Sequence, residues 1–283
     1  MNVLRAQSAG FCMGVDLALR KLDQLLLDRA GGAPIYTFGP IIHNPQVLER
    51  YATLGVRRCE DPESIEPDAT VLIRAHGVPR QTDARLAERG VCVADATCPK
   101  VKKAQKLIAK KADQGSMLLL YGERTHPEVR GLLSHASHGA FVFDSLAELQ
   151  KFPLTPADSY FLAAQTTQDE MEFERIREYL CRALGQDVPV LRTICHATRQ
   201  RQEEVIAIAK KVDFMVVVGG HNSGNTRRLA KVAETQGVEC AHVETASELP
   251  LEKIRGKRTV GLTAGASTPN DIIDAVEAAL RAL

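Results

Sequence analysis

The chain has 283 residues, and its 36 Lys and Arg against 35 Asp and Glu give a formal net charge of +1. This length predicts two or three domains with a large core. The near-neutral charge, the 5% aromatic content and the absence of Trp count against a nucleic-acid groove built from basic residues and stacking rings. The sequence shows neither a signal-peptide pattern nor a long apolar span, so we expect a cytoplasmic protein with no membrane partner and reduced cysteines.

Short apolar runs along the chain end in a polar or small-residue loop and then give way to a helical pattern. The clearest predicted strands are, in chain order, 71–74, 117–121, 161–164, 214–218 and 260–263. Strands that alternate with amphipathic helices indicate parallel sheets covered by helices, which is an α/β fold. In such sheets, the loops at the carboxyl ends of the strands bind ligands.

Three segments share one plan of helix, strand, short helix and further strand. They begin at Asn44, His126 and Asn225. A cysteine just before a predicted helix lies 28 to 32 residues upstream of each segment, and these cysteines are Cys12, Cys98 and Cys195. The last strand of each segment ends 64 to 72 residues after its cysteine, at His76, Thr166 and Ser267. This regularity predicts three related α/β domains.

We expect the domains to span residues 15–97, 98–193 and 194–283, with residues 1–14 forming an N-terminal strand that packs at the centre. A pseudo-threefold arrangement of the three parallel sheets would bring the three cysteines together. Three thiolates from distant loops supply three ligands to one metal centre. The absence of C-x-x-C spacing counts against a zinc ribbon or a thioredoxin motif.

A cubane iron–sulfur cluster held by three cysteines keeps an open position on its fourth iron, where a substrate oxygen can bind. The alternative is that the cysteines only pack in the core. We interpret four other cysteines as buried packing residues in this way: Cys59, Cys92, Cys181 and Cys240.

Other residues at the predicted strand-to-helix junctions are hydrogen-bonding groups with little fixed charge. They are His43, His76, His126, Ser223, Asn225 and Ser267. Several helix N-termini around one cavity form an anion site, which suits a phosphate or a diphosphate. Ser, Thr and Asn are also ordinary N-caps, so a capping role remains open for Ser223, Asn225, Thr166 and Ser267.

Glu128 follows His126 by two residues, on a loop or in a first helical turn. It is either an acid that complements the helix dipole or a buried proton donor with a raised pKa. The basic run at residues 100–111 is either a solvated helix face or a docking face for an acidic electron donor.

Eight motifs in order resemble the IspH/LytB family of 4-hydroxy-3-methylbut-2-enyl diphosphate reductases. They are GFCMGV, RAHGVP, DATCP, YGERTHPEV, AAQTTQ, ICHATRQRQ, NSGNTRRL and AGASTP, and the resemblance runs from Met1 to the C-terminus. It implies an oxygen-sensitive 4Fe-4S oxidoreductase that ends the non-mevalonate route of isoprene biosynthesis. Reductive removal of the substrate's allylic hydroxyl would yield isopentenyl and dimethylallyl diphosphates.

The resemblance also implies roles for individual residues. One 4Fe-4S cluster per chain, with an open fourth iron, would be held by Cys12, Cys98 and Cys195. The residues implied to hold the diphosphate are His43, His76, His126, Ser223, Gly224, Asn225 and Ser267. Glu128 would deliver protons, with His126 beside this network, and Thr166 would orient the leaving oxygen. Ferredoxin or flavodoxin would donate the electrons.

The chain departs from the family pattern at the diphosphate loop, where Asn-Ser-Ser-Asn is replaced by Asn222, Ser223, Gly224 and Asn225. The hydroxyl of the second serine is absent, although the N–H of Gly224 still offers a donor at close approach. Because one hydrogen bond is lost, we expect the substrate to bind more weakly by about 0.5–1.5 kcal/mol than it would with a serine. Thr167 competes with Thr166 for the orienting role, and the alignment of Thr166 with His76 and Ser267 favours Thr166.

Two other functions remain possible. A quinolinate-synthase-like enzyme would use a three-cysteine cluster for dehydration without net electron transfer. A non-catalytic phosphate-ligand binding protein would use the loop ends alone, with the cysteines in the core. The His, Ser and Asn positions fit the reductase better than the dehydratase. A colourless protein without iron after anaerobic purification would favour the binding protein.

Overall fold

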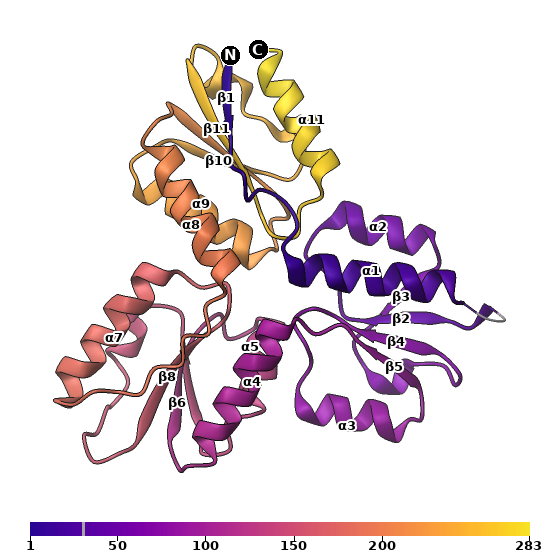
Figure 1. Ribbon diagram of the computed structural model, residues 1–283, viewed down its shortest axis with the longest axis vertical. Coiled ribbons are helices and arrows are strands. Elements are labelled where there is room, and N and C mark those ends of the chain that lie inside the picture. The colour runs from indigo at the N-terminus through magenta and orange to yellow at the C-terminus, as the bar shows by residue number, and fades with distance from the viewer. Residues whose placement is uncertain (30–31) are drawn as a thin grey trace. The chain divides into compact units, whose positions relative to one another are not determined.

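The computed structural model describes residues 1–29 and 32–283. Within these residues the chain forms an α/β fold with three sheets, and the paired strands in each sheet are parallel (Figure 1). The predicted fold class is therefore confirmed. The five strands predicted from apolar runs all exist, and each end lies within one residue of its predicted position.

In each sheet, one inner strand is flanked by the next two strands of the chain. The first sheet runs β3 (Val56–Cys59), β2 (Ile35–Phe38), β4 (Thr70–Ile73) and β5 (Cys92–Asp95). The second runs β7 (Ala140–Phe143), β6 (Met117–Tyr121) and β8 (Tyr160–Ala164). The third runs β10 (Cys240–Val243), β9 (Phe214–Val218), β11 (Thr259–Ala264) and β1 (Asn2–Arg5).

Helices connect and cover these strands. They are α1 (Met13–Leu27), α2 (Pro45–Thr53), α3 (Arg80–Glu88), α4 (Pro99–Ala112), α5 (Pro127–Leu133), α6 (Leu146–Leu149), α7 (Glu170–Leu184), α8 (His196–Ala209), α9 (Gly224–Thr235), α10 (Leu251–Ile254) and α11 (Asn270–Arg281). Two short 3₁₀ helices span Pro62–Ser64 and Ala246–Glu248. Among the described residues, none of the helices has the length and apolar character needed to cross a bilayer.

The predicted repeat is visible in the topology. The strands β2, β6 and β9 each pair with the next two strands of the chain, one on either side. A glycine follows each of these inner strands and donates its N–H to the carbonyl that ends the neighbouring strand. The pairs are Gly39 with Cys59 (2.7 Å), Gly122 with Phe143 (2.8 Å) and Gly219 with Val243 (2.9 Å). The same backbone hydrogen bond therefore follows the inner strand in all three sheets.

The chain forms two compact units. Unit 1 comprises Met1–Asp16, Ile42–Tyr51 and His196–Leu283, and unit 2 comprises Leu17–Ile41 and Ala52–Cys195. The first two sheets lie in unit 2. The third lies in unit 1, where β1 pairs with β11 along Asn2–Arg5. The division into three domains at residues 15, 98 and 194 stays a prediction.

Unit 1 has a sheet covered on both faces. Alternate residues of β9, such as Val216 and Val218, pack in one core with Ile273 of α11. The residues between them, such as Val217, pack in another core with Val205 of α8 and Leu229 of α9. This alternation follows from the two-residue period of a strand, and it explains why β9 is apolar throughout.

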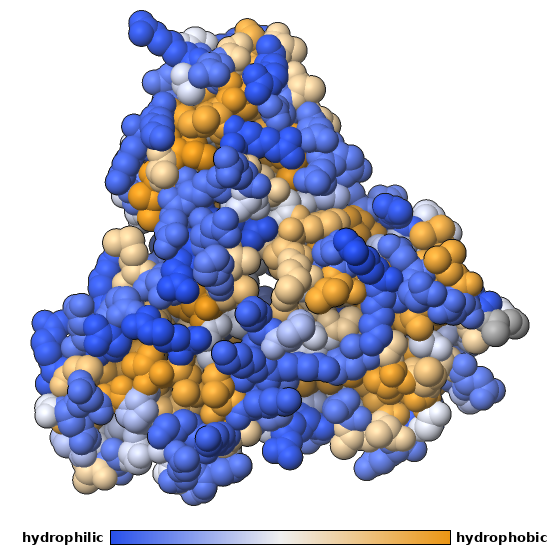
Figure 2. All heavy atoms as spheres, viewed as in Figure 1, coloured by the Kyte–Doolittle hydropathy of each residue, from blue (hydrophilic) through white to orange (hydrophobic). Residues whose placement is uncertain are grey.

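Unit 2 repeats this arrangement around its second sheet. Leu119 of β6 packs with Phe173 of α7, whereas its neighbours in the strand pack with α4 and α5, as Leu120 does with Ile108 and Val129. The other side of α4 carries lysines, and hydrophilic residues cover that part of the surface in Figure 2. In the first sheet, β2 and β4 share a core with Leu86 of α3.

The cysteines that we interpreted as packing residues behave differently from one another. Cys59 is buried and its thiol donates to the Thr37 carbonyl, and burial raises its pKa to about 11. Burial likewise raises the pKa of Cys240 to about 12. Cys181 is half-buried. The interpretation is wrong for Cys92, which is exposed because β5 is an edge strand of its sheet.

Candidate functional site

The three repeat-related cysteines, Cys12, Cys98 and Cys195, each make an equivalent backbone hydrogen bond. Each donates its N–H to a carbonyl that lies two residues beyond the end of a strand, namely β11, β4 or β8. The donor and acceptor pairs are Cys12 with Ala266 (3.2 Å), Cys98 with Ala75 (2.9 Å) and Cys195 with Thr166 (2.9 Å). All three cysteines are half-exposed. Each sheet thus places one cysteine at the carboxyl end of its strands.

Each of these cysteines also precedes a helix. Cys98 is the N-cap of α4, with Pro99 as the first helical residue. The carbonyl of Cys12 accepts the N–H of Asp16 in the first turn of α1 (2.9 Å), and Cys195 immediately precedes α8. The positive end of a helix dipole attracts negative charge, which suits a thiolate that ligates a metal.

In unit 2, Glu128 and Thr166 are in direct contact. Glu128 lies in the first turn of α5 and is 1% exposed. Its Oε1 accepts the N–H of Thr166 (2.6 Å) and its Oε2 accepts the Thr166 hydroxyl (2.8 Å). Burial raises the pKa of Glu128 to about 7, although the two hydrogen bonds act in the opposite direction. The carboxyl can therefore hold or release a proton near neutral pH.

Two histidines lie beside this pair. His126 is the N-cap of α5, and its Nδ1 accepts the N–H of Glu128 (3.2 Å). An Nδ1 that accepts a hydrogen bond carries no proton, so Nε2 is the donor in the neutral ring. The rings of His126 and His76 meet edge to face, with their centroids 5.1 Å apart. Unit 2 therefore brings His76, His126, Glu128 and Thr166 into one polar group.

The contacts favour Thr166 over Thr167 as the partner of Glu128. Thr167 Oγ1 instead accepts a hydrogen bond from the Gln165 side chain (3.1 Å). In its position within the repeat, however, Thr166 corresponds to Ala75 and Ala266, because the carbonyl of each accepts the N–H of a repeat-related cysteine. The alignment of Thr166 with His76 and Ser267 was therefore wrong by one residue. His76, Thr167 and Ser267 each lie three residues beyond the end of their strand.

In unit 1, Ser223 and Ser267 lie together beside the N-terminus of α9. The Ser267 hydroxyl donates to Ser223 Oγ (3.5 Å) and to the carbonyl of His43 (3.3 Å). Ser223 is also the N-cap of α9 and accepts the N–H of Thr226 (3.3 Å). A capping role is thus confirmed for Ser223. It does not explain Ser267, because the N-cap of α11 is Pro269.

The first turn of α9 adds further donors. Gly224 and Asn225 are its first two residues and both are buried. Backbone N–H groups in a first turn have no acceptor within the helix. The buried Asn225 Nδ2 also has no hydrogen-bond partner within the described part of the chain. These donors at a helix N-terminus form an arrangement that binds an anion.

Two residues near His43 were missed by the sequence analysis. A Cβ on Gly220 would lie 2.4 Å from the His43 carbonyl oxygen, so only glycine fits there. Asn44 caps α2 by accepting the N–H of Val47 (3.0 Å). The Asn-Pro sequence at the start of α2 is a helix-start signal that could have identified the cap. The contact of Gly220 has no local signal.

The predicted site residues divide between the two units. Unit 1 holds Cys12, His43, Ser223, Gly224, Asn225 and Ser267, and unit 2 holds His76, Cys98, His126, Glu128, Thr166 and Cys195. Within each unit these residues lie in the loops after the carboxyl ends of the strands or in the first turns of the helices that begin there. This is the edge of a parallel sheet at which ligands bind.

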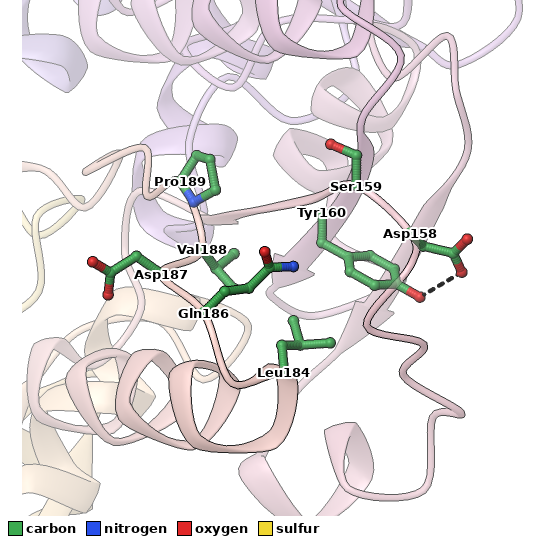
Figure 3. Close-up of a pocket in the computed structure, with 8 residues that line it drawn as sticks. All are labelled: Asp158, Ser159, Tyr160, Leu184, Gln186, Asp187, Val188 and Pro189. Carbon is green, nitrogen blue, oxygen red and sulfur yellow. Dashed lines mark hydrogen bonds between the residues drawn. The ribbon is translucent and has the colours of Figure 1, made fainter.

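A cavity of about 120 Å³ lies elsewhere in unit 2 (Figure 3). It is lined by the loop before β8 and by residues that follow α7, and the Tyr160 hydroxyl donates to Asp158 Oδ2 (3.0 Å). Tyr160 begins β8, whereas Thr166 follows its carboxyl end. The cavity is therefore separate from the group around Glu128.

Comparisons with known proteins find similar sequences over the whole chain. The sequence model of a family described as LytB protein matches residues 3–281. A 4-hydroxy-3-methylbut-2-enyl diphosphate reductase of Nitratidesulfovibrio vulgaris (strain DP4) is 59% identical over 100% of both chains. The reductase of the same name from Solidesulfovibrio magneticus is 58% identical over 99% of both chains.

Two solved structures share the fold. The E-1-hydroxy-2-methyl-but-2-enyl-4-diphosphate reductase of Plasmodium falciparum matches with a TM-score of 0.91 and 25% identity, over 96% of this chain and 86% of that one. An (E)-4-hydroxy-3-methyl-but-2-enyl diphosphate reductase, described as the terminal enzyme of the non-mevalonate pathway, matches with a TM-score of 0.70 and 37% identity over 100% of both chains.

Proposed function

The chain belongs to the LytB protein family, and from this premise we propose that it is a 4-hydroxy-3-methylbut-2-enyl diphosphate reductase. Relatives with this name are 59% identical over the full length. The enzyme is an oxidoreductase of the non-mevalonate route to isoprenoids. Its substrate gains two electrons and two protons, loses its allylic hydroxyl as water, and leaves as isopentenyl or dimethylallyl diphosphate.

The family implies an iron–sulfur cofactor, and the proposed form is a 4Fe-4S cluster held by Cys12, Cys98 and Cys195. The three thiols fit this group. Each of the three cysteines is half-exposed, donates its N–H to an equivalent carbonyl at a strand end, and precedes a helix. When bound, such a cluster would supply electrons one at a time and a Lewis-acidic iron with an open coordination position.

The contact between Glu128 and Thr166 carries the proposal for the chemistry. Departure of hydroxide from an allylic carbon is unfavourable, whereas water leaves readily once the oxygen is protonated. Glu128 is buried and its pKa is raised to about 7, so a protonated carboxyl is available at neutral pH. It passes its proton to the Thr166 hydroxyl, which in turn donates to the departing oxygen.

The diphosphate is assigned to the polar groups at the strand ends. Ser223, Ser267 and Asn225 offer side-chain donors, and Gly224 offers a backbone N–H in the first turn of α9. His43, His76 and His126 complete the assigned set. Hydroxyl, amide and imidazole donors together with a helix dipole hold the anion without the fixed charge of a lysine or arginine.

The electrons come from a small one-electron carrier, ferredoxin or flavodoxin in this proposal. The cytoplasm is the proposed location. Family membership and the contact between Glu128 and Thr166 favour the reductase over both a quinolinate-synthase-like dehydratase and a phosphate-ligand binding protein without catalysis.

Anaerobic turnover tests the proposal. Protein reconstituted with iron and sulfide is mixed with reduced methyl viologen and 4-hydroxy-3-methylbut-2-enyl diphosphate, and the products are identified by mass spectrometry. Isopentenyl and dimethylallyl diphosphates are the expected products. Reconstituted protein that contains iron but leaves this substrate unchanged would contradict the proposed function.

A further inference from the structure

The helix α4 has an unusual charge for a chain that is nearly neutral overall. It carries six lysines and no acidic residue between Pro99 and Ala112. Like charges three or four positions apart on a helix repel each other, as between Lys102 and Lys106. The lysines in the first turn also oppose the helix dipole. The basic composition therefore destabilises α4, which indicates that this surface has a role other than folding.

The lysines occupy the side of α4 that faces away from its core. Its apolar residues Val101, Ala104, Ile108 and Ala112 are buried, and the last three share a core with Leu118 of β6 and Leu132 of α5. Four lysines are exposed, and we call them the α4 lysine face: Lys100, Lys103, Lys106 and Lys110. Figure 2 shows hydrophilic residues over the region that α4 occupies in Figure 1.

The α4 lysine face is not neutralised within the described part of unit 2. The acidic partner on this side, Asp95, pairs with Lys102 (2.5 Å). Lys102 is half-buried and does not belong to the exposed set. No ion pair or hydrogen bond joins the four exposed side chains to an acidic group among residues 1–29 and 32–283. A partner with carboxylates would therefore meet an uncompensated positive surface.

The same helix leads directly to a proposed ligand of the cluster. Cys98 is the N-cap of α4, and Lys100 and Lys103 follow it within about one and a half helical turns. A protein bound to this end of the α4 lysine face lies close to Cys98. A shorter separation favours electron transfer between two redox centres.

We propose that the α4 lysine face docks an acidic one-electron carrier protein and that electrons enter beside Cys98. This inference rests on the proposed function and names the partner surface of the same site. An acidic protein fits better than single-stranded nucleic acid, because the face offers no aromatic ring for base stacking. Redox partners typically associate through small, charged and transient interfaces.

The test compares binding with turnover in the reconstituted holoenzyme. The probe is an acidic plant-type ferredoxin, titrated by isothermal calorimetry under anaerobic conditions. The double variant Lys103→Glu and Lys106→Glu should weaken ferredoxin binding by at least about tenfold at low salt. Turnover with reduced methyl viologen should stay unchanged, because this small dye needs no docking surface.

Two controls separate position from charge. Lys210→Glu with Lys211→Glu makes the same charge change on two exposed lysines just beyond the end of α8, and it should leave ferredoxin binding unchanged. Lys103→Arg with Lys106→Arg keeps the charge and should bind ferredoxin as the wild type does. Far-UV circular dichroism and iron content should match the wild type in each variant.

Several results would overturn the inference. These are absence of ferredoxin binding by the wild type, equal binding by the Lys103 and Lys106 variant, and equal loss in the Lys210 and Lys211 variant. Binding of an RNA oligonucleotide in place of ferredoxin would also overturn it. A failure of the proposed function is distinguishable, because the wild type would then not turn over the diphosphate with methyl viologen.

Discussion

Glu128 accepts two hydrogen bonds from one residue, the N–H of Thr166 at 2.6 Å and its hydroxyl at 2.8 Å. The residues are 38 positions apart and come from α5 and from the loop after β8. The backbone bond fixes one carboxyl oxygen, so the other faces a hydroxyl that can exchange a proton with it. This geometry gives a buried acid a defined route for its proton.

Replacement of Glu128 by glutamine keeps the size of the side chain and removes its acidic proton. We expect turnover with reduced methyl viologen to fall by about 10²–10⁴-fold, the usual contribution of a general acid. Iron content should stay at the wild-type level, since Glu128 is not a proposed ligand. Thr166→Ser, which retains a hydroxyl, is the control and should remain far more active. Near wild-type turnover of Glu128→Gln with a full cluster would remove Glu128 from this role.

The pH dependence of turnover follows from the raised pKa of Glu128. Its pKa of about 7 predicts that the proton-donating form is lost as the pH rises through 7. The ratio kcat/KM, which reports the pKa of the enzyme without substrate, should then fall about tenfold per pH unit above that point. Steady-state rates from about pH 6 to about pH 9 check this expectation. A flat profile over that range would show that Glu128 does not limit the reaction.

The same shift makes stability depend on pH. Burial raises the pKa of Glu128 from 4.5 in its ordinary state to about 7 in the folded chain. The folded state therefore loses stability as the pH rises from 4.5 to 7, by about 3 kcal/mol at 1.36 kcal/mol per pKa unit. Glu128→Gln removes this loss, so the free energy of unfolding of the variant should rise relative to that of the wild type across that pH range. Urea unfolding at matched cluster content measures it, and a constant difference would contradict the prediction.

Gly224 occupies the first position of α9, where the family pattern has serine. Gly224→Ser adds a hydroxyl beside the donors assigned to the diphosphate. We expect a lower Michaelis constant, corresponding to about 0.5–1.5 kcal/mol for one hydrogen bond. The turnover number should stay unchanged, because the contact is far from the leaving oxygen in the substrate. A higher Michaelis constant in the variant would contradict this assignment.

The loop after β9 depends on the absence of a side chain at Gly220. A Cβ there would lie 2.4 Å from the His43 carbonyl oxygen, so Gly220→Ala must move one of the two segments. Overpacking of this kind costs about 1–3 kcal/mol. We expect a lower melting temperature together with a higher Michaelis constant, because the same carbonyl accepts the Ser267 hydroxyl. An unchanged melting temperature would show that the loop adapts freely.

Much of the fold was predictable because local patterns determine it. The apolar run at Phe214–Val218 is a strand because both of its faces are buried. Glu128 and Thr166 were also predictable as candidates. Their contact was not, since it depends on how α5 and β8 pack. The alignment of Thr166 with His76 and Ser267 was wrong by one residue for a similar reason. The correct alignment follows from the hydrogen bond between Cys195 and Thr166, which are far apart in the chain.

The exposure of Cys92 shows another limit of sequence patterns. A free cysteine is usually buried, but Cys92 begins β5, which lies at a sheet edge. Strand order within a sheet is decided by long-range pairing, so the local sequence does not reveal which strand is at the edge. The close approach of Gly220 to His43 was missed for the same reason, because their segments are far apart in the chain.

Iron and acid-labile sulfide content tests most directly the central claim that the repeat-related cysteines hold one redox cluster. The measurement compares anaerobically reconstituted wild type with Cys98→Ser and with Cys92→Ser, in which an exposed cysteine outside the proposed ligand set is replaced. We predict about four irons and four sulfides per chain in the wild type and in Cys92→Ser, and a depleted or lost cluster in Cys98→Ser. Full iron and sulfide content in Cys98→Ser, or none in the wild type, would contradict the account.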